Sequence, residues 1–361
     1  MQSAPPASPP FTGPLLLLVP ASLLLVWRLP LATPGLASGA LPSDSSSGTP
    51  GANATVTLPL CSEVQRLPSG AQWAQRGVAH PFRPAGCQYH HWDLASARAC
   101  LRGRHLYVIG NSVARDFYYQ ALSGLCQLPR DTRAELGCKR SGGACSERCA
   151  NISFTYLFSN SLGPPQAGYR FHDPDACPLT VEECTRNLLA DSAVGDALVF
   201  LLGMSLAWEF KHLTAENTSA STAPGPGLGQ PLPAERLAFA GLVAEAGLAW
   251  RGMVQRHWRG SQRHVFRLRL PPLSLGNTSF DHGLDRVFLH TTAGLLGAVN
   301  EGLDSAFEGT QWGTIDQWGV NAALSEDAGG NRAHYRDFIH YNDEPHDAAL
   351  DIALEALCSR Q

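Results

Sequence analysis

Short apolar runs alternate with longer amphipathic segments from about residue 105 to the end of the chain. Apolar runs bounded by Gly or polar residues predict buried strands, and they span 105–110, 152–158, 196–203 and 264–270, with a last short strand within 312–320. Apolar residues that recur every three or four positions predict helices, at 113–125, 181–190, 234–257, 294–307 and 345–357. Strands that alternate with helices favour a parallel sheet with helices on both faces. The pattern therefore predicts a three-layer α/β fold.

The first 60 residues follow a different pattern. Residues 15–27 are largely apolar, whereas 33–60 are rich in Ser, Gly, Ala, Pro and Thr, as in a flexible stem. A membrane-spanning helix needs about 20 apolar residues, whereas a cleaved signal peptide has about 7–15 and a small-residue cleavage site, for which Ser38-Gly39-Ala40 is suitable. We favour a signal-anchor and keep a cleaved signal peptide as the alternative. The predicted organisation is a tail at 1–14, the signal segment at 15–32, the stem at 33–60 and one folded domain at 61–361.

The cysteines and most glycosylation sequons lie in the part of the chain predicted to fold. All ten cysteines fall between Cys61 and Cys358, and the four within 126–149 predict an excursion tied by disulfides. Four N-x-[ST] sequons predict N-glycosylation at Asn53, Asn151, Asn217 and Asn277. Disulfides and N-glycans form together in an oxidising compartment. We therefore expect a secretory-pathway glycoprotein whose domain lies in the lumen or outside the cell.

Charge and ligand spacing argue against other classes of protein. The formal net charge is -4, from 27 basic and 31 acidic residues. Nucleic-acid binding would require a basic patch or stripe, and nothing in this balance of charges suggests one. His90 and His91 are adjacent, which in a strand directs them to opposite faces. No Cys or His spacing resembles a zinc site. We expect no nucleic-acid partner, no metal and no other cofactor.

A candidate nucleophile, Ser112, directly follows the first predicted strand, in the sequence Gly110-Asn111-Ser112-Val113-Ala114-Arg115. The carboxyl ends of parallel strands are where α/β sheets form their sites. Gly110 allows the chain to turn sharply, and a serine at a helix N-terminus can use its own N–H and the helix dipole to stabilise an oxyanion. The alternative is that Asn111 or Ser112 is simply a helix N-cap.

A candidate base, His340, precedes the last predicted helix in the sequence Asp337-Phe338-Ile339-His340. A serine nucleophile needs a base, and the base needs an orienting group. An Asp three residues before a His can hydrogen-bond one ring nitrogen and leave the other to face a serine. The alternative is a surface loop in which an acid and a histidine occur by chance, since Asp343, His346 and Asp347 lie nearby.

Together the two segments resemble the SGNH/GDSL hydrolase superfamily, and within it the PC-esterase branch. That branch includes the trichome-birefringence-like polysaccharide O-acetyltransferases and the lumenal domain of the sialic acid O-acetyltransferase. Its first block, Gly-Asp-Ser-x-x-Arg, is matched by residues 110–115 except at Asn111, and its last block, Asp-x-x-His, by Asp337 and His340. Tyr341 is also similar to many relatives, and the strand at 196–203 resembles the third block.

The resemblance implies an SGNH-like sheet with a Ser-His-Asp triad. Ser112 would be the nucleophile, His340 the general base and Asp337 its orienter. The oxyanion hole would use the N–H groups of Ser112 and Gly203, with Ser205 in place of the usual Asn donor.

The resemblance also implies supporting residues and an activity. Asn111 and Arg115 would support the active-site loops or contact substrate. The implied activity is transfer or hydrolysis of O-acyl groups, above all O-acetyl groups, on glycans in the Golgi lumen. Transferase and esterase stay open, as do the acyl donor and the acceptor sugar, and a secreted or cell-surface location is the alternative.

Two positions depart from the family pattern. Asn111 replaces an Asp, which keeps the turn chemistry but loses a charge. Ser205 stands where the superfamily often has Asn, and deletion of such a donor costs about 3–4 kcal/mol in other enzymes. Both slower catalysis and a fold kept only for binding therefore remain open.

Two rival functions use other residues. A catalytically inactive glycan-binding or adhesion module would stack sugars on exposed tryptophans, for which the candidates are Trp73, Trp92, Trp312 and Trp318. A lumenal glycosyltransferase would hold a divalent cation and a nucleotide sugar through Asp-x-Asp, a spacing found at Asp173-Pro174-Asp175. The proline and the nearby Cys177 favour a rigid turn there instead.

Overall fold

The structure is a computed structural model that describes most of the predicted domain. The described residues are 58–64, 66–67, 72–73, 82–128, 144–159, 181–204, 207, 233–273, 286–325 and 339–359. They all belong to one compact unit, Val56–Gln361. The predicted tail, signal segment and most of the stem lie outside the described residues, so the predictions made for them stay predictions.

Six strands of the described residues form one sheet in the order β4-β5-β3-β6-β7-β8. Their bounds are β3 His105–Gly110, β4 Ala144–Cys149, β5 Ile152–Phe158, β6 Ala197–Phe200, β7 Val265–Leu268 and β8 Gly313–Ile315. All neighbouring strands are parallel except β4, which pairs antiparallel with β5. The central strands β3, β6 and β7 are buried except at His105, the first residue of β3, as expected for largely apolar strands of a parallel sheet.

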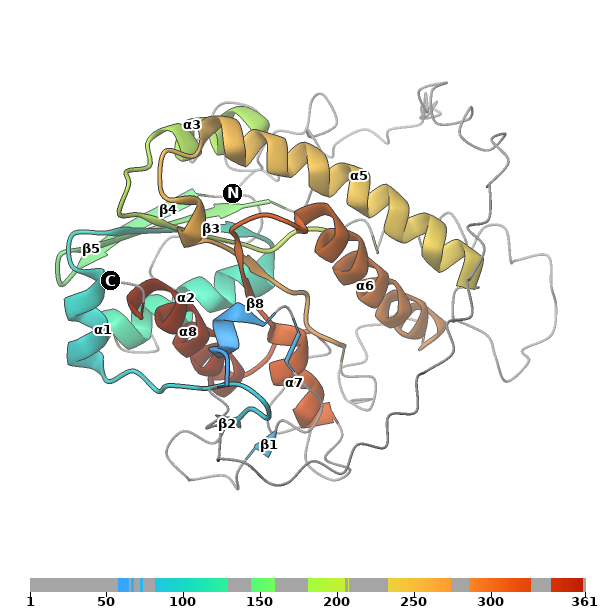
Figure 1. The fold of residues 1–361 in the computed structure, drawn as a ribbon, viewed down its shortest axis with the longest axis horizontal. Helices are drawn as coiled ribbons and strands as arrows, with labels where there is room; N and C mark the ends of the chain where they lie inside the picture. The colour runs from blue at the N-terminus through green and yellow to red at the C-terminus, as the bar shows by residue number, and fades with distance from the viewer. Residues whose placement is uncertain are drawn as a thin grey trace, which may run out of the picture. The chain divides into compact units, whose positions relative to one another are not determined.

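Helices cover both faces of the sheet (Figure 1). One face carries α3 Val181–Ala190, α5 Pro233–His257 and α6 Arg286–Phe307, and the other carries α1 Leu94–Leu101, α2 Ser112–Cys126, α7 Gln317–Ser325 and α8 Asp343–Cys358. Short elements complete the unit: the 3-10 helices η3 Cys61–Glu63 and η5 Gln262–His264, and the hairpin strands β1 Gln72–Trp73 and β2 Phe82–Arg83. The prediction of an α/β fold with helices on both faces is confirmed.

The strand order creates a switch point beside β3. After β3 the chain passes through α2 to β5 on one side, and after β6 it passes through α5 to β7 on the other side. The connections at the carboxyl ends of β3 and β6 therefore diverge, and such a crevice is where open α/β sheets bind ligands. The predicted nucleophile follows β3, and the predicted oxyanion-hole glycine follows β6.

Two predicted segments differ from the structure. The excursion at 126–149 does carry a disulfide, Cys126–Cys149, but its last six residues form the strand β4. The turn residues Ala150 and Asn151 both have positive φ, which makes a tight hairpin and hence an antiparallel pair. In addition, the segment at 312–320 holds β8 and then the start of α7, a helix that the prediction lacked.

Disulfides join elements that are far apart in the chain. Within the described residues they are Cys61–Cys87, Cys100–Cys358 and Cys126–Cys149, and Cys145 and Cys184 are also disulfide-bonded. Cys100–Cys358 ties α1 to the end of α8 across 258 residues of sequence. Closing a loop of that length stabilises a fold by about 5 kcal/mol in the chain-entropy model. Bonding of this extent indicates an oxidising environment.

The segment before α1 packs against the C-terminal half of the chain. Asp351 of α8 accepts hydrogen bonds from the Tyr89 hydroxyl at 2.8 Å and the Trp92 N–H at 3.2 Å, and it lies 2.7 Å from His91 Nδ1. The indole N–H of Trp73 donates to the Val320 carbonyl at 2.9 Å. These contacts attach the described part of the segment before α1 to α7 and α8.

One helix segment of the described residues, Arg236–His257 within α5, is long and apolar enough to cross a membrane by length and composition. It packs along α6, where a side chain on Gly302 would collide with the Ala240 carbonyl. Core helices of soluble domains pass the same test, so this segment is weak evidence for a membrane span.

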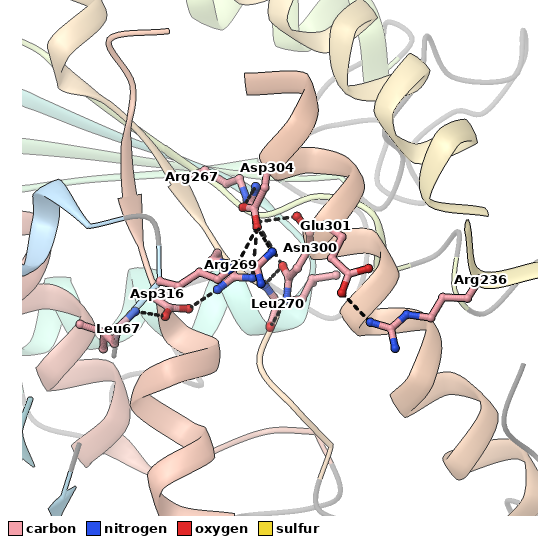
Figure 2. Close-up of polar contacts among 10 residues, drawn as sticks. Leu67, Arg236, Arg267, Arg269, Leu270, Asn300, Glu301, Asp304 and Asp316 are labelled. Atoms are coloured by element: carbon pink, nitrogen blue, oxygen red, sulfur yellow. Dashed lines mark hydrogen bonds and ion pairs between the residues drawn. The ribbon is translucent and has the colours of Figure 1, made fainter. Parts of the chain in front are cut away.

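A buried ion network joins β7, β8 and α6 (Figure 2). Arg267 Nη1 lies 2.7 Å from Asp304 Oδ1, and Arg269 bridges Asp304 at 3.3 Å and Asp316 at 3.0 Å. The second oxygen of Asp316 accepts the Leu67 N–H at 2.7 Å, which attaches the N-terminal segment to the same network. Burial lowers the pKa of Arg267 to about 10, so its guanidinium stays charged at neutral pH.

We expect Asp304→Ala to destabilise the protein by about 3–5 kcal/mol, because it leaves two buried arginines without their shared carboxylate. Glu301→Ala on the same helix is the matched control, since its pair with Arg236 is exposed and such pairs contribute up to about 1 kcal/mol. Urea unfolding of both variants measures the difference. Equal losses would contradict the assignment of Asp304 as the centre of the network.

Glu355 of α8 is a buried carboxyl group, 1% exposed, and lies beside the N-terminal segment. Burial, together with Glu63 and Asp351 nearby, raises its pKa from 4.5 to about 7, against the opposing effect of the Ser62 and Cys61 N–H groups. A raised folded-state pKa favours the protonated form of the native protein. Its contribution to stability is therefore present below the unfolded pKa and lost as the pH rises through about 7.

We expect Glu355→Gln to remove this dependence, because glutamine stays neutral. The free energy of unfolding of the variant, relative to the parent, should rise by up to about 3 kcal/mol between pH 5 and pH 8. Urea unfolding at the two pH values tests the expectation. A difference between variant and parent that does not change with pH would contradict it.

Candidate active site

The site begins where β3 passes close to the segment after β6. The Leu201 N–H donates to the Ile109 carbonyl at 2.8 Å, which brings the next residue, Gly110, against the Leu201 backbone. A Cβ on Gly110 would lie 2.5 Å from the Leu201 carbonyl oxygen and 2.7 Å from Ala114 Cβ. Because no side chain fits there, position 110 must be glycine if the strand is to turn into α2.

Asn111 and Ser112 start α2. Asn111 is the N-cap, and its Oδ1 accepts the Val113 N–H at 2.9 Å. Ser112 is the first residue of the helix and is half-buried. The predicted N-cap role of this segment is thus confirmed for Asn111, which leaves the Ser112 side chain available for another partner.

That partner is His340. The Nε2 atom of His340 lies 2.8 Å from Ser112 Oγ, although the two residues are 228 positions apart in the sequence. This is hydrogen-bond distance, with geometry suited to a base that takes a proton from a serine. The structure therefore brings together the two residues that the sequence predicted as nucleophile and base.

Several anchors hold His340 in place. Its neighbours Ile339 and Tyr341 are both buried, and the Tyr341 hydroxyl donates to the Pro272 carbonyl beyond β7. The helix that follows His340 is α8, and its Asp347 accepts a hydrogen bond from the side-chain amide of Gln120 on α2 at 2.5 Å. The two segments that carry Ser112 and His340 are thus linked to each other and to the sheet.

Tyr156 of β5 contacts the turn that carries Ser112. Its hydroxyl lies 3.0 Å from both the Gly110 and the Asn111 carbonyl oxygens. Burial raises its pKa well above the ordinary value of tyrosine, so the hydroxyl keeps the proton that it donates. Nothing in the local sequence near residue 156 indicates this role, because the contact depends on the pairing of β3 with β5.

The predicted oxyanion-hole glycine follows β6. Gly203 has φ +94, a conformation that side chains other than glycine rarely adopt. The next residue, Met204, is 5% exposed, and its sulfur accepts from Asn111 Nδ2 at 2.9 Å. The Gly203–Met204 segment therefore lies directly beside the turn that carries Ser112. The sequence reasoning missed Met204.

Two charged residues lie one helical turn beyond the nucleophile. Arg115 is half-buried and lies near the turn, since its positive charge lowers the pKa of the Tyr156 hydroxyl against the larger effect of burial. Asp116 is 7% exposed, and its negative charge raises the pKa of the same hydroxyl. The sequence analysis named Arg115 but not Asp116, although a carboxylate four residues after a candidate nucleophile shares its helix face.

Several predicted residues lie outside the described residues. They are Asp337 and Ser205 of the candidate site, the sequons Asn53, Asn217 and Asn277, and the Asp173-Pro174-Asp175 segment. Asn151 is described and is exposed in the turn between β4 and β5, where its Oδ1 accepts from Arg148 at 2.9 Å. Its glycosylation remains a prediction.

The four tryptophans proposed for sugar stacking are not exposed. All are half-buried and packed against the hydrophobic core: Trp73, Trp92, Trp312 and Trp318. The indole of Trp312 also packs on Phe307 with ring centroids 5.0 Å apart, and its N–H donates to Gln262 Oε1 at 2.7 Å. The expectation of exposed stacking platforms is therefore wrong, because core packing uses these rings. Among the described residues there is also no group of His, Cys, Asp and Glu placed to hold a metal ion.

We expect Gly110→Ala to destabilise the protein by about 3 kcal/mol or more, because its methyl group would overlap the Leu201 backbone. Gly124→Ala is the matched control in α2, since a Cβ there would meet Leu350 Cδ2 at an ordinary 3.8 Å. Alanine should stabilise that helix by about 0.5–1 kcal/mol. Thermal unfolding separates the two cases, and a Gly110→Ala variant as stable as the parent would contradict the close approach.

No protein-family model matches the chain, and no curated protein matches it. Among solved structures it is similar to LAE5, described as an alpha/beta hydrolase enzyme from the metagenome of Lake Arreo, Spain. The TM-score is 0.37 and the sequence identity is 11%, over 71% of this chain and 97% of that one. A likeness at this level carries no argument about activity, so the function must be argued from the site itself.

Proposed function

We propose that this chain is a serine acyl-esterase or acyltransferase that acts on O-acyl groups of glycans in the secretory pathway. The observation that carries the proposal is the 2.8 Å contact between Ser112 Oγ and His340 Nε2 at the switch point of the sheet. A base in contact with a serine at a helix N-terminus is the arrangement that acyl transfer requires.

The first chemical step uses the residues already in contact. His340 Nε2 takes the proton of the Ser112 hydroxyl while Oγ forms a bond to the acyl carbonyl carbon. The carbonyl oxygen becomes an oxyanion, for which the N–H of Ser112 at the start of α2 and the N–H of Gly203 are the proposed donors. His340 then returns the proton to the leaving alkoxide, which leaves an acyl group on Ser112.

The second step decides between the two activities. Water attacking the acyl-serine gives an esterase, and a sugar hydroxyl gives a transferase. His340 serves as base in either case. Asp337, three residues before His340 in the sequence, is the proposed orienter of the imidazole.

The proposed substrate class and location follow from the disulfides and from the resemblance of the sequence. The disulfides indicate an oxidising compartment, and the sequence resembles enzymes that act on O-acetyl groups of glycans. O-acetylated glycans in the Golgi lumen are therefore the proposed substrates, and attachment to the membrane through 15–32 is the proposed topology.

The test is whether Ser112 reacts. We expect the full chain, produced through a eukaryotic secretory pathway, to be labelled by a fluorophosphonate probe and to release acetate from p-nitrophenyl acetate. Ser112→Ala should abolish labelling, and Ser112→Ala and His340→Ala should each lower acetate release by at least about 1,000-fold. Mass spectrometry of the labelled peptide identifies the site.

Ser123→Ala is the matched control, since Ser123 is half-buried on the same helix and lies outside the site. It should behave like the parent. Labelling that persists in Ser112→Ala would sink the proposal. An absence of labelling in the folded parent would also sink it and would favour the glycan-binding module.

A further inference from the structure

A side-chain hydrogen bond joins the two sides of the candidate site. The nucleophile turn follows β3 and the Gly203–Met204 segment follows β6, and connections from these strands diverge at the switch point. Across this crevice Asn111 Nδ2 donates to Met204 Sδ at 2.9 Å. Both residues are buried, with exposed fractions of 4% and 5%.

The orientation of the Asn111 amide is fixed by its other end. Its Oδ1 accepts the Val113 N–H at 2.9 Å, so the amide nitrogen must face Met204. Two neighbouring carbonyl groups are also fixed, since the Tyr156 hydroxyl contacts the Gly110 and Asn111 carbonyls and the Ser159 N–H donates to the same Gly110 carbonyl at 2.8 Å. The Met204 sulfur is thus held by a rigid donor.

We propose that Asn111 and Met204 are a matched pair of positioning residues, which sets the Gly203 N–H relative to Ser112 Oγ. This inference rests on the proposed function of the site. Gly203 is adjacent to Met204 and has a positive φ, so its backbone direction follows the anchored side chain next to it. A misplacement of about 1 Å in such a site can cost about 100-fold in rate.

The pair also accounts for asparagine rather than aspartate at position 111. A carboxylate would still cap α2, because it accepts the Val113 N–H as well as an amide does. It has no proton to donate, however, and would turn a negative oxygen toward the Met204 sulfur, which is itself an acceptor. Asp at position 111 therefore requires a donor at position 204.

This requirement defines a rescue experiment. Asn111→Asp removes the donor, and Met204→Leu removes the acceptor at similar side-chain volume. In Asn111→Asp with Met204→Gln, the glutamine amide donates to the new carboxylate and restores the hydrogen bond with its polarity reversed. The full chain and all variants are compared by rate of fluorophosphonate labelling, by kcat and KM for p-nitrophenyl acetate, and by thermal unfolding.

We expect Asn111→Asp to lower the labelling rate and kcat about 10- to 100-fold with little change in KM. The double variant should recover at least about ten-fold of a 100-fold loss, as coupled neighbours do. Met204→Leu should also lower the labelling rate and kcat. Met253→Leu, a change of the half-buried methionine on α5, is the matched control and should label like the parent.

The outcomes separate the inference from the proposed function. Labelling that depends on Ser112 but falls equally in Asn111→Asp and in the double variant would overturn the pairing alone. Parent-like labelling in Met204→Leu would do the same. Losses that follow only the unfolding temperature would show a structural role instead. An unlabelled parent would overturn the proposed function and the pairing together.

Discussion

The close approach of the backbone at Gly110 to the Leu201 carbonyl is the constraint on which the rest of the site depends. Parallel neighbours β3 and β6 are registered so that Ile109 lies beside Phe200, and the next residue of each strand meets backbone to backbone. A side chain at position 110 would hold the two strand ends apart. With glycine there, the segments that follow both strands enter one crevice. Ser112 and Gly203, which belong to these two segments, therefore both lie at this crevice.

The candidate base reaches this crevice from the other end of the chain. Its position therefore depends on contacts between segments that are far apart in the sequence. His340 precedes α8, whose far end is tied to α1 by Cys100–Cys358 and whose Asp351 is held by Tyr89 and Trp92. A helix fixed at its far end and along its side cannot slide freely along its axis. The 2.8 Å distance between Ser112 and His340 is therefore supported by contacts far from the reacting atoms. The described residues of the segment before α1 therefore help to position the helix that follows His340.

Local pattern was enough to predict the apolar buried strands and an amphipathic helix with regular spacing. The strands β3 and β5 and the helix α3 have the predicted bounds, because continuous apolar runs and regular spacing follow directly from burial. The edge strand β4 was missed for the converse reason: its side chains alternate between half-buried and exposed, and its sequence is polar. The site shows the same division. Ser112 and His340 carry recognisable motifs, whereas Tyr156 and Met204 act through strand pairing and loop contact, which no local signal encodes.

Of the two departures from the pattern that the sequence resembles, Asn111 lies within the described residues, where it caps α2 beside the candidate nucleophile. The candidate nucleophile and base are in contact, although they are 228 positions apart in the sequence. In an oxyanion hole, backbone N–H groups supply donors and a side-chain donor adds to them. Asn111 still caps α2, and its amide nitrogen gains a partner in Met204. A binding module does not require a histidine in contact with a serine hydroxyl, whereas acyl transfer through a serine does. The 2.8 Å contact between Ser112 Oγ and His340 Nε2 therefore favours an enzyme over a module that only binds.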